Sequence, residues 1–526
     1  MSPRRAGAGL DLWALRLTPL LLAGLLGYLD TLTLHSIRHE EVVESVRNVY
    51  WFDQGLVYDG VYTNIGWYGT LLAAYKVFGF SLATAKYVRL ALYLAGLYAA
   101  AALMVRYMRP RTAMVPLLLI GLSPTVLYFS TTQISCGVDM PYAAMCLWLM
   151  LSGRAGSTAA RDLAFTFGAG LVAMVAAMSY PAFVLYLPSL ALVFLWHSRQ
   201  VGSTARAGLG RSLAAHVGAA ATGFALPLAA AFMYVTTRHL LLYDPATDAG
   251  MFRSGGRLGA DPSAFWQAVV AVGTDLFVAG RSYYYDVTRP DFSGVLAPIG
   301  LLVSLGTFVY LALSRRIDGM LAAAVGLAVV MGLVVPSLGV DGEPGIRRAT
   351  ILLAATFAAF TMTWRWLAAP HASAPRWRRA AMAGCALLPL AFALKVPALA
   401  EDLEGPNRFQ NRDWFAAAAT PADALARVVT GLDQGQQLAC PLDPEGKVTP
   451  CRYQEIYAAV AGYREWNGLA AKDIHALDWR TGRDIVLSTT LWRDGYYPTC
   501  SRKDVCQRDM NAIFAAMRQE GGAPDR

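Results

Sequence analysis

The stretch Gly294–Leu313, GVLAPIGLLVSLGTFVYLAL, has 20 residues and no charged side chain. A helix needs roughly 20 mostly apolar residues to cross the hydrocarbon core of a bilayer. This stretch therefore predicts a membrane-spanning helix. Ten further segments are similarly apolar: Leu12–Leu32, Ala83–Met104, Ala113–Phe129, Pro141–Leu151, Leu163–Met178, Pro181–Trp196, Ala214–Val235, Met320–Val335, Ala349–Trp366 and Ala380–Val396. The sequence thus predicts an α-helical polytopic membrane protein with about 11 transmembrane helices.

Composition supports this class. The 526 residues are 56% hydrophobic and 15% charged, whereas a soluble globular protein averages about 25% charged residues. The net charge of +9 is spread over short loops instead of one basic patch, which argues against nucleic-acid binding.

The basic loops predict an orientation, because cytoplasmic loops of membrane proteins carry an excess of Lys and Arg. With the N-terminus inside, every predicted inside loop is basic. These loops hold Arg4 and Arg5; Arg106, Arg109 and Arg111; Arg154 and Arg161; Arg199, Arg206 and Arg211; Arg315 and Arg316; and Arg376, Arg378 and Arg379. An odd number of spans then puts the C-terminal part outside, in the periplasm or the extracellular space of a protein of the cytoplasmic membrane.

The cysteines indicate the same side. Cys136, Cys146 and Cys385 lie in apolar stretches and are expected to be inert core residues. The other four, Cys440, Cys451, Cys500 and Cys506, lie in the polar C-terminal part. Pairing Cys440 with Cys451 and Cys500 with Cys506 is the simplest of three disulfide connectivities, and zinc binding is the alternative. Disulfides form in oxidising compartments.

Two domains are predicted. Residues 1–399 form the transmembrane part, and residues 400–526 form a small α/β domain outside, with strand-like runs such as Asp484–Ser488.

The first outside loop contains most of the candidate catalytic and binding residues. It begins Arg38-His39-Glu40-Glu41 and closes with Tyr58-Asp59-Gly60-Val61-Tyr62-Thr63-Asn64-Ile65-Gly66-Trp67-Tyr68-Gly69. Between these lies a helical pattern, Val42, Val46, Val49 and Tyr50, that predicts a helix along the membrane surface. Glu40 and Glu41 are either a capping pair on a solvated loop or carboxylates held at the interface as a general base or metal ligand.

Three other outer features have two interpretations each. Asp139 caps the following helix, or it is paired or faces a cavity at the mouth of a span. Arg347 and Arg348 pair with Asp341 or Glu343, or they bind an anionic lipid phosphate. The aromatic run around Tyr284 belongs to an interfacial belt, or it offers ring faces to a sugar.

These features together resemble the GT-C superfamily of integral-membrane glycosyltransferases, which includes protein O-mannosyltransferase, aminoarabinose transferase and arabinofuranosyltransferase-like families. The likeness lies mainly in residues 30–150: the acidic pair Glu40-Glu41, the Tyr58–Gly69 stretch, and Gly137-Val138-Asp139-Met140-Pro141-Tyr142. His39-Glu40-Glu41 stands where the family usually has an Asp-Glu pair.

The resemblance implies an inverting glycosyltransferase that moves a sugar from a polyprenyl-phosphate carrier to a glycan, lipid or protein acceptor at the outer face of the membrane. The catalytic residues would be Glu40 or Glu41, with Asp139 in support. The substrate would contact His39, Asp59, Tyr62, Trp67, Tyr284, Arg347 and Arg348. A metal stays open, since Mg²⁺ or Mn²⁺ would need Glu40, Glu41 and Asp139 to converge. The alternative functions are another lipid-linked enzyme of the outer face, and a polytopic transporter or lipid flippase.

Overall fold

The computed structural model describes residues 3–32, 43–53, 64–153, 158–202, 209–237, 293–337, 350–369 and 376–404. Of the C-terminal part it describes 426, 429–435, 460, 463–464, 466–470, 472, 474–477 and 484–487. The elements are α1 Pro3–Leu32, η1 Val43–Asn48, α3 Val49–Asp53, α4 Ile65–Phe78, α5 Leu82–Tyr107, α6 Pro110–Gly121, α7 Pro124–Thr131, α8 Asp139–Met150, α9 Ala160–Ser179, η3 Pro181–Tyr186, α10 Leu187–Gly202, α11 Leu209–Thr237, α14 Ser293–Leu313, α15 Gly319–Ser337, α16 Thr350–Ala368, α17 Arg376–Glu404, β1 Ile474–Leu477 and β2 Asp484–Leu487.

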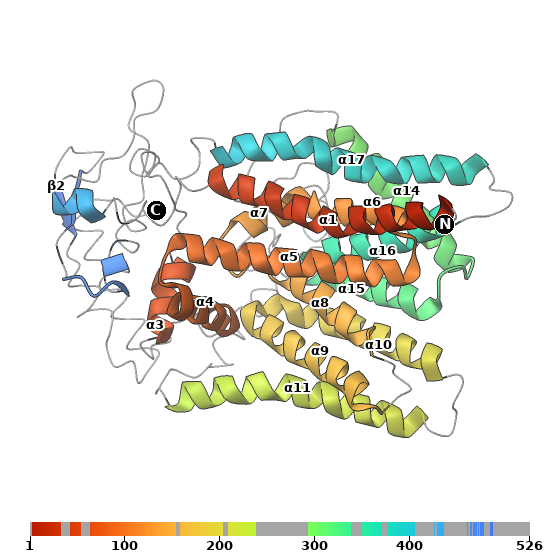
Figure 1. Ribbon diagram of the computed structural model, residues 1–526, viewed down its shortest axis with the longest axis horizontal. Coiled ribbons are helices and arrows are strands. Elements are labelled where there is room, and N and C mark those ends of the chain that lie inside the picture. The colour runs from red at the N-terminus through yellow and green to blue at the C-terminus, as the bar shows by residue number, and fades with distance from the viewer. Residues whose placement is uncertain are drawn as a thin grey trace, which may run out of the picture.

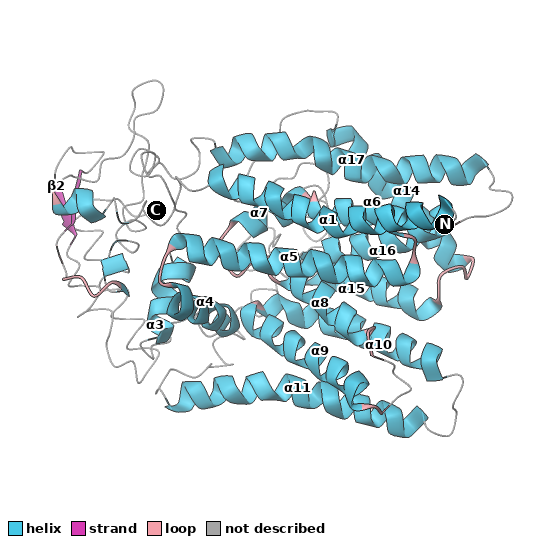
Figure 2. Ribbon diagram, in the orientation of Figure 1, coloured by secondary structure: helices cyan, strands magenta, loops and turns pink. Residues whose placement is uncertain are grey.

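Long helices run side by side along the longest axis of the molecule (Figure 1). Figure 2 shows that nearly all the described chain is helical. Within the described ranges, eight helices are long and apolar enough to cross a membrane, and a bent pair would make a ninth. The chain is therefore a multi-pass membrane protein of the helical class. The predicted count of 11 stays a prediction, because α8, with 12 residues, and Gly319–Leu333 of α15 are shorter than a span within the described residues.

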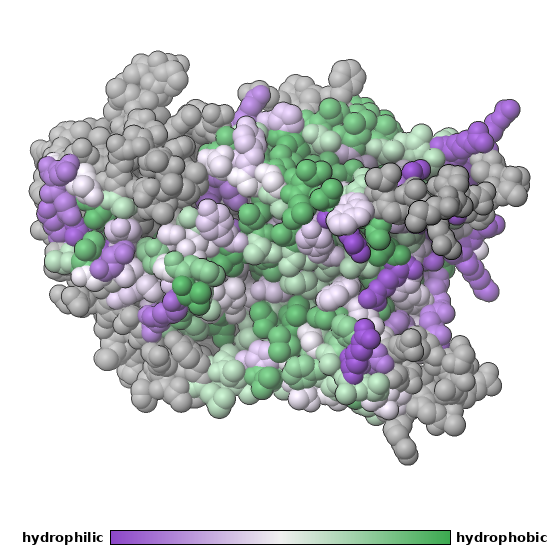
Figure 3. Space-filling view, viewed as in Figure 1, coloured by the Kyte–Doolittle hydropathy of each residue, from purple (hydrophilic) through white to green (hydrophobic). Residues whose placement is uncertain are grey.

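The surface has the matching pattern. Figure 3 shows a hydrophobic band across the middle of the molecule, with hydrophilic side chains toward its two ends. Exposed leucines, valines and aromatics are abundant on the outer helices, for example Leu21, Leu302 and Phe232. Apolar side chains exposed in this number belong in a lipid environment.

One predicted span is broken. The stretch predicted as a single helix, Ala113–Phe129, is instead α6 followed by α7, with a bend of 57° between them. The break lies at Ser123-Pro124, where Pro124 occupies the first turn of α7. Proline has no N–H to donate to the preceding turn, so it starts a helix well and interrupts a continuing one.

Short helices gather at one end of the bundle, beyond the start of α5. The helix predicted in the first outside loop is present as the π-helical turn η1 and the α-helix α3. The Trp67-Tyr68-Gly69 end of the aromatic stretch lies in α4. This end of the bundle, with α3, α4 and the described C-terminal strands, is opposite the N-terminus in Figure 1.

The C-terminal part contributes one antiparallel hairpin, in which β1 pairs with β2 from Ile474 opposite Leu487 to Leu477 opposite Asp484. The predicted strand at Asp484–Ser488 coincides with β2. Two four-residue strands do not establish an α/β domain, so that domain and its boundary at residue 400 stay predictions; α17 continues to Glu404.

Candidate active site at one end of the bundle

A glycine turn sets the position of Asp139. Gly137 has φ +79°, a left-handed conformation that side chains with a Cβ rarely adopt. A Cβ on Gly137 would also lie 2.6 Å from the Cβ of Phe129 in α7. The chain can therefore reverse tightly after α7 and begin α8 at Asp139, inside the packed end of the bundle.

Asp139 holds three segments of the chain together. Its carboxylate is fully buried, and Oδ2 accepts hydrogen bonds from Tyr186 Oη, at 2.8 Å, and from Thr350 Oγ1. Tyr186 ends η3 and Thr350 begins α16. The partners of Asp139 thus lie on other elements, so helix capping does not account for this residue.

The second carboxylate oxygen of Asp139 differs from Oδ2 in its hydrogen bonding. Oδ1 of Asp139 is buried and has no hydrogen-bond partner among the described residues. A buried carboxylate oxygen without a donor is costly, by about 1–3 kcal/mol or more. Such an atom is often explained by function or by a ligand.

Arg89 provides positive charge beside Asp139. It is 3% exposed, and its guanidinium interacts electrostatically with the carboxylates of Asp139 and Glu44. Its Nη2 donates to the backbone carbonyl oxygens of Phe129 and, at 2.8 Å, of Cys136. The guanidinium carbon also lies 5.3 Å from the ring centre of Trp67. Arginine suits this environment because its planar fork serves two acceptors while its face stacks on an aromatic ring.

Glu44 brings the first outside loop to the same place. Its carboxylate accepts the backbone N–H of Ser135 at 2.7 Å. The neighbouring Ser45 is fully buried and donates to Oε1 of Gln133 at 2.8 Å. These two bonds fix η1 to the connection between α7 and α8. Glu44, which is partly buried, and the buried Arg89 and Asp139 therefore form one cluster of alternating charge, called here the polar cluster.

A second cation serves the broken span. Lys86 Nζ lies 3.5 Å from Oδ1 of Asp30 and 3.5 Å from the carbonyl oxygen of Thr131, the last residue of α7. All three residues are buried. Together with Arg89 on Phe129, Lys86 supplies donors to carbonyl groups that the end of α7 leaves without partners in its own helix.

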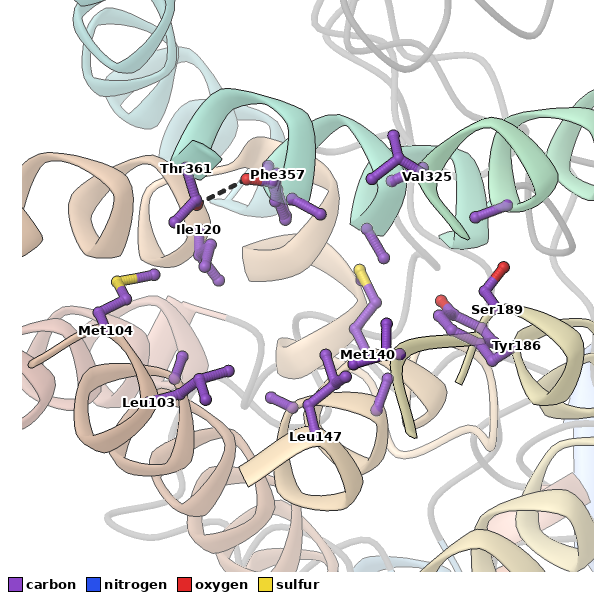
Figure 4. Close-up of a pocket in the computed structure, with 18 of the residues that line it drawn as sticks. Leu103, Met104, Ile120, Met140, Leu147, Tyr186, Ser189, Val325, Phe357 and Thr361 are labelled. Carbon is purple, nitrogen blue, oxygen red and sulfur yellow. Dashed lines mark hydrogen bonds between the residues drawn. The ribbon is translucent and has the colours of Figure 1, made fainter. Parts of the chain in front are cut away.

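An apolar slot of about 310 Å³ begins beside the polar cluster. Its wall includes Met140, next to Asp139, and Tyr186, which donates to Asp139. Side chains of α5, α8, α10, α15 and α16 face one another across it (Figure 4). On α8 the lining extends from Met140 to Leu151, which corresponds to about 17 Å along a helix. The slot therefore follows the helix axes from the polar cluster toward the far end of the bundle, where Arg365 contributes to the wall.

The few polar groups of the slot are mostly satisfied by the protein. Tyr93 Oη donates to the carbonyl of Gly121 at 2.8 Å, and Thr361 Oγ1 donates to the carbonyl of Phe357 at 2.6 Å (Figure 4). Ser189 Oγ and the indole N–H of Trp196, which also belong to lining residues, have no hydrogen-bond partner among the described residues. The rest of the lining is mainly apolar. This is the environment for a hydrocarbon chain.

The predicted site residues fall into two groups. Asp139 and Trp67 are described, and both belong to this end of the bundle. Trp67 is fully buried, and its indole N–H donates to the carbonyl of Gln133 at 3.1 Å, so it braces the polar cluster from within. The others lie outside the described residues: His39, Glu40, Glu41, Asp59, Tyr62, Tyr284, Arg347 and Arg348. In the sequence, Glu41 precedes Glu44 by three positions and Arg348 precedes Thr350 by two.

Four members of this site were not singled out from the sequence: Glu44, Arg89, Tyr186 and Thr350. Arg89 carried a usable signal, because a charged residue inside an apolar run marks a functional or paired position. Glu44 lies within the amphipathic pattern of the first outside loop. A single acidic residue there is a weaker signal than the adjacent pair Glu40-Glu41. Tyr186 and Thr350 have no local signal, since their role depends on contact with a distant carboxylate.

No group of three or more His, Cys, Asp or Glu side chains that could hold a metal ion occurs among the described residues. Cys136, Cys146 and Cys385 are free and buried, as predicted. The four C-terminal cysteines lie outside the described residues, so their pairing stays a prediction.

No protein-family model matches the chain, and no curated protein matches it. Solved structures with a similar fold include ArnT from Cupriavidus metallidurans bound to undecaprenyl phosphate, at 15% identity and a TM-score of 0.45, covering 84% of each chain. The apo form of that protein gives 14% identity and a TM-score of 0.42, covering 80% of this chain and 81% of that one.

The oligosaccharyltransferase of Archaeoglobus fulgidus, in a complex with zinc and sulfate, gives 14% identity and a TM-score of 0.44, covering 84% of this chain and 61% of that one. At this identity and TM-score, no substrate and no residue role transfers from these proteins.

Proposed function

We propose that the chain is a membrane glycosyltransferase that takes a sugar from a polyprenyl-phosphate carrier and transfers it at the end of the bundle that holds Asp139. One observation carries the proposal: the polar cluster adjoins an apolar slot, and Tyr186, which lines the slot, donates a hydrogen bond to Asp139 of the cluster. An amphiphile with a long hydrocarbon chain and a charged, sugar-bearing head has this same division of polarity.

The hydrocarbon chain of the carrier would occupy the slot. Burial of apolar surface contributes about 25 cal/mol per Å², or about 0.8 kcal/mol per methylene group. A slot that follows the helix axes lets the chain lie parallel to the lipid tails while its head reaches the polar cluster. Undecaprenyl phosphate linked to a sugar is the first donor to test.

The chemistry would be a single displacement at the anomeric carbon. The acceptor hydroxyl oxygen forms a bond to that carbon, and the bond from carbon to the phosphate oxygen breaks. The hydroxyl proton passes to a carboxylate, Glu40 or Glu41, and the bonding electrons leave with the lipid phosphate. General-base assistance of this kind typically supplies roughly 10²–10⁴-fold.

Cations would stabilise the charge that develops on the leaving phosphate. Arg347 and Arg348 are proposed for this role, since they immediately precede α16 and its Thr350–Asp139 hydrogen bond. Asp139 would hold Tyr186, Thr350 and Arg89 in place and so support the base and the donor. His39, Asp59, Tyr62 and Tyr284 are proposed to contact sugar or acceptor, and Trp67 to act through Arg89.

The reaction would take place at the outer face of the cytoplasmic membrane. The described arginines gather where α5 ends and α6 begins, where α14 ends, and where α17 begins: Arg106, Arg109, Arg111, Arg315, Arg316, Arg376 and Arg378. The polar cluster lies at the opposite end of these helices. Basic loops favour the cytoplasm, which supports an outside position for the polar cluster and the C-terminal part.

A transfer assay on the purified full-length protein tests the function. Labelled sugars on undecaprenyl phosphate would be supplied with glycan, lipid and peptide acceptors, with and without chelator. We expect transfer of at least one sugar, and a loss of roughly 10²-fold or more in Glu40→Gln or Glu41→Gln protein. Wild-type protein that transfers no sugar from the panel but moves labelled lipid between leaflets of vesicles would overturn the proposal in favour of a flippase.

A further inference from the structure

A tryptophan of the C-terminal part packs against the short helices α3 and α4 and the connection from α4 to α5. Trp466 stacks on Phe80, with ring centres 5.2 Å apart and an angle of 4° between the planes. It meets Tyr50 and Tyr75 edge to face, at 5.5 Å in each case. Lys76 Nζ lies 5.8 Å from the same ring. Stacked and edge-to-face aromatic pairs stabilise a contact beyond the apolar area they bury, so this cluster is a stable attachment.

Ring packing, not hydrogen bonding, makes the attachment. The indole N–H of Trp466 is buried without a hydrogen-bond partner among the described residues. Tyr463, from the same part of the chain, adds a second ring contact to Phe80 at 6.4 Å. Trp466 is thus held by three rings that belong to α3, α4 and the connection from α4 to α5.

Tyr75 links this aromatic cluster to the polar cluster. Its ring touches Trp466, and it is 3% exposed. Its hydroxyl donates to the backbone carbonyl of Ser45 at 2.9 Å. Ser45 follows Glu44, whose carboxylate is bonded to the N–H of Ser135. The path from Trp466 to Glu44 therefore passes through one side chain, Tyr75, and one hydrogen bond, from the Tyr75 hydroxyl to the backbone carbonyl of Ser45.

The turn η1, which accepts the hydrogen bond from Tyr75, depends on contacts with other elements for its stability. Glu44 and Ser45 lie in the π-helical turn η1, and π-helical turns are rare and occur mainly at functional sites. Six residues are too few to be stable as an isolated helix. The hydrogen bond from Tyr75, the bonds to Gln133 and Ser135, and a bond from Asn48 Nδ2 to Tyr68 Oη at 3.1 Å help to fix this turn.

We infer that Trp466 is a positioning residue: it clamps Tyr75, and through Tyr75 the C-terminal part fixes the turn that presents Glu44 to Arg89. The catalytic consequence rests on the proposed function, because Glu44 matters to the rate only if the reaction takes place at the polar cluster. The C-terminal part thereby controls the geometry of the turn η1.

Hydrogen exchange of the full-length protein in detergent tests the clamp without reference to activity. In Trp466→Leu protein, amide exchange across Val43–Asn48 is expected to accelerate about tenfold or more. Tyr75→Phe keeps the ring contacts and removes only the hydroxyl, and should accelerate exchange of the same segment. The double variant should exchange no faster than the more affected single variant, because both changes break one path.

Leu469→Ala is the matched control, since Leu469 lies three residues from Trp466 and is 44% exposed; exchange across Val43–Asn48 should match the wild type. Unchanged exchange in Trp466→Leu protein, or equal acceleration in α9, would overturn the inference. In the transfer assay Trp466→Leu should lower kcat with little change in KM for the donor, and Trp466→Phe should restore part of kcat. If the wild type transfers no sugar while the exchange results hold, the proposed function fails and the clamp stands.

Discussion

At the scale of single residues, Asp139 accounts for most of the order in the polar cluster. One oxygen of its carboxylate joins η3 to α16, and its charge faces Arg89. Buried charges of opposite sign add little net stability as a pair, but removing one partner leaves the other uncompensated. The cluster is therefore sensitive to any single change in charge.

Asp139→Asn tests this sensitivity. We expect a loss of about 3 kcal/mol in stability, because Arg89 loses one of its two carboxylate partners in a buried site. Transfer activity should fall by about 10²-fold as the donors around Asp139 lose their orientation. Thermal unfolding in detergent and the transfer assay measure the two effects.

The matched control for Asp139→Asn is Asp11→Asn, because Asp11 forms an exposed ion pair with Arg111 at the other end of the bundle. Exposed pairs contribute about 0–1 kcal/mol. If the two aspartate variants unfold at the same temperature, Asp139 does not have the role described.

Tyr186→Phe removes one donor from Asp139 and keeps the ring, which stacks on Phe183 at 5.3 Å and 17°. The expected loss of stability is about 1.5–3 kcal/mol, the range for a hydrogen bond to a charged group. Tyr310→Phe serves as control, since Tyr310 is 50% exposed on α14, and should change the unfolding temperature little. Equal effects of the two tyrosine changes would contradict the importance of the bond to Asp139.

The sequence shows which residues of this site are unusual for their apolar surroundings. It does not show which of them are in contact with one another. Asp139 was identified from its place at the start of an apolar run, and Trp67 from the aromatic stretch before α4. Tyr186 and Thr350 could not be found, because they lie 47 and 211 residues from Asp139 in the chain. Proximity across such distances follows from helix packing, which a single sequence does not encode locally.

At the scale of elements, the close contact between two helices determines which glycines cannot be replaced by a larger residue without a loss of stability. Gly170 of α9 lies against α11, where an added Cβ would be 2.1 Å from the carbonyl oxygen of Ala220. Small residues at such positions let membrane helices approach closely. The obstacle is backbone, so the two helices would have to separate.

Gly170→Ala should therefore lower the stability by about 1–3 kcal/mol, the usual effect of overpacking. Gly218→Ala, on α11, is the control, because a Cβ there meets nothing within 4 Å; alanine should be neutral or stabilise the helix by up to about 1 kcal/mol. Thermal unfolding of both variants in the same detergent compares them. A lower unfolding temperature for Gly218→Ala than for Gly170→Ala would refute this packing argument.

Most helices were predictable because a bilayer imposes a simple rule on length and composition. The segments from Gly294–Leu313 and Ala83–Met104 needed only that rule, and α14 and α5 agree with them within a few residues. The break between α6 and α7 was missed, since the apolar run continues through Pro124. Hydropathy measures how apolar a segment is. It does not report whether the backbone of that segment is straight.

At the scale of the whole molecule, the proposed orientation can be measured by labelling single cysteines in cells. Asn467→Cys, in the C-terminal part, should react with a membrane-impermeant maleimide in intact cells. Ser314→Cys, beside Arg315 and Arg316, should react only after permeabilisation. Both positions are exposed, and the three free native cysteines among the described residues are buried. Labelling in the reverse pattern would invert the topology and exclude an outer-face reaction.

Filling the slot tests whether a chain occupies it. Ala324 of α15 lines the slot and is 4% exposed, so Ala324→Phe should displace about two methylene groups of a bound chain. At about 0.8 kcal/mol per methylene, KM for the donor should rise roughly tenfold, with little change in kcat. Ala229→Phe places the same side chain on the exposed face of α11 and should leave KM unchanged. An unaltered KM in Ala324→Phe protein would show that the donor chain lies elsewhere.

The cations beside α7 have a consequence for sequence comparison. Carbonyl groups at the end of α7 accept from Arg89 and Lys86, two cations that α5 carries into an otherwise apolar environment. Lys86 also pairs with Asp30, and Arg89 interacts with Asp139 and Glu44. A neutral residue in place of either cation would deprive a carbonyl of a donor and a carboxylate of its counter-charge. Homologues are therefore expected to keep each cation together with an acidic partner, or to lose both members of the pair.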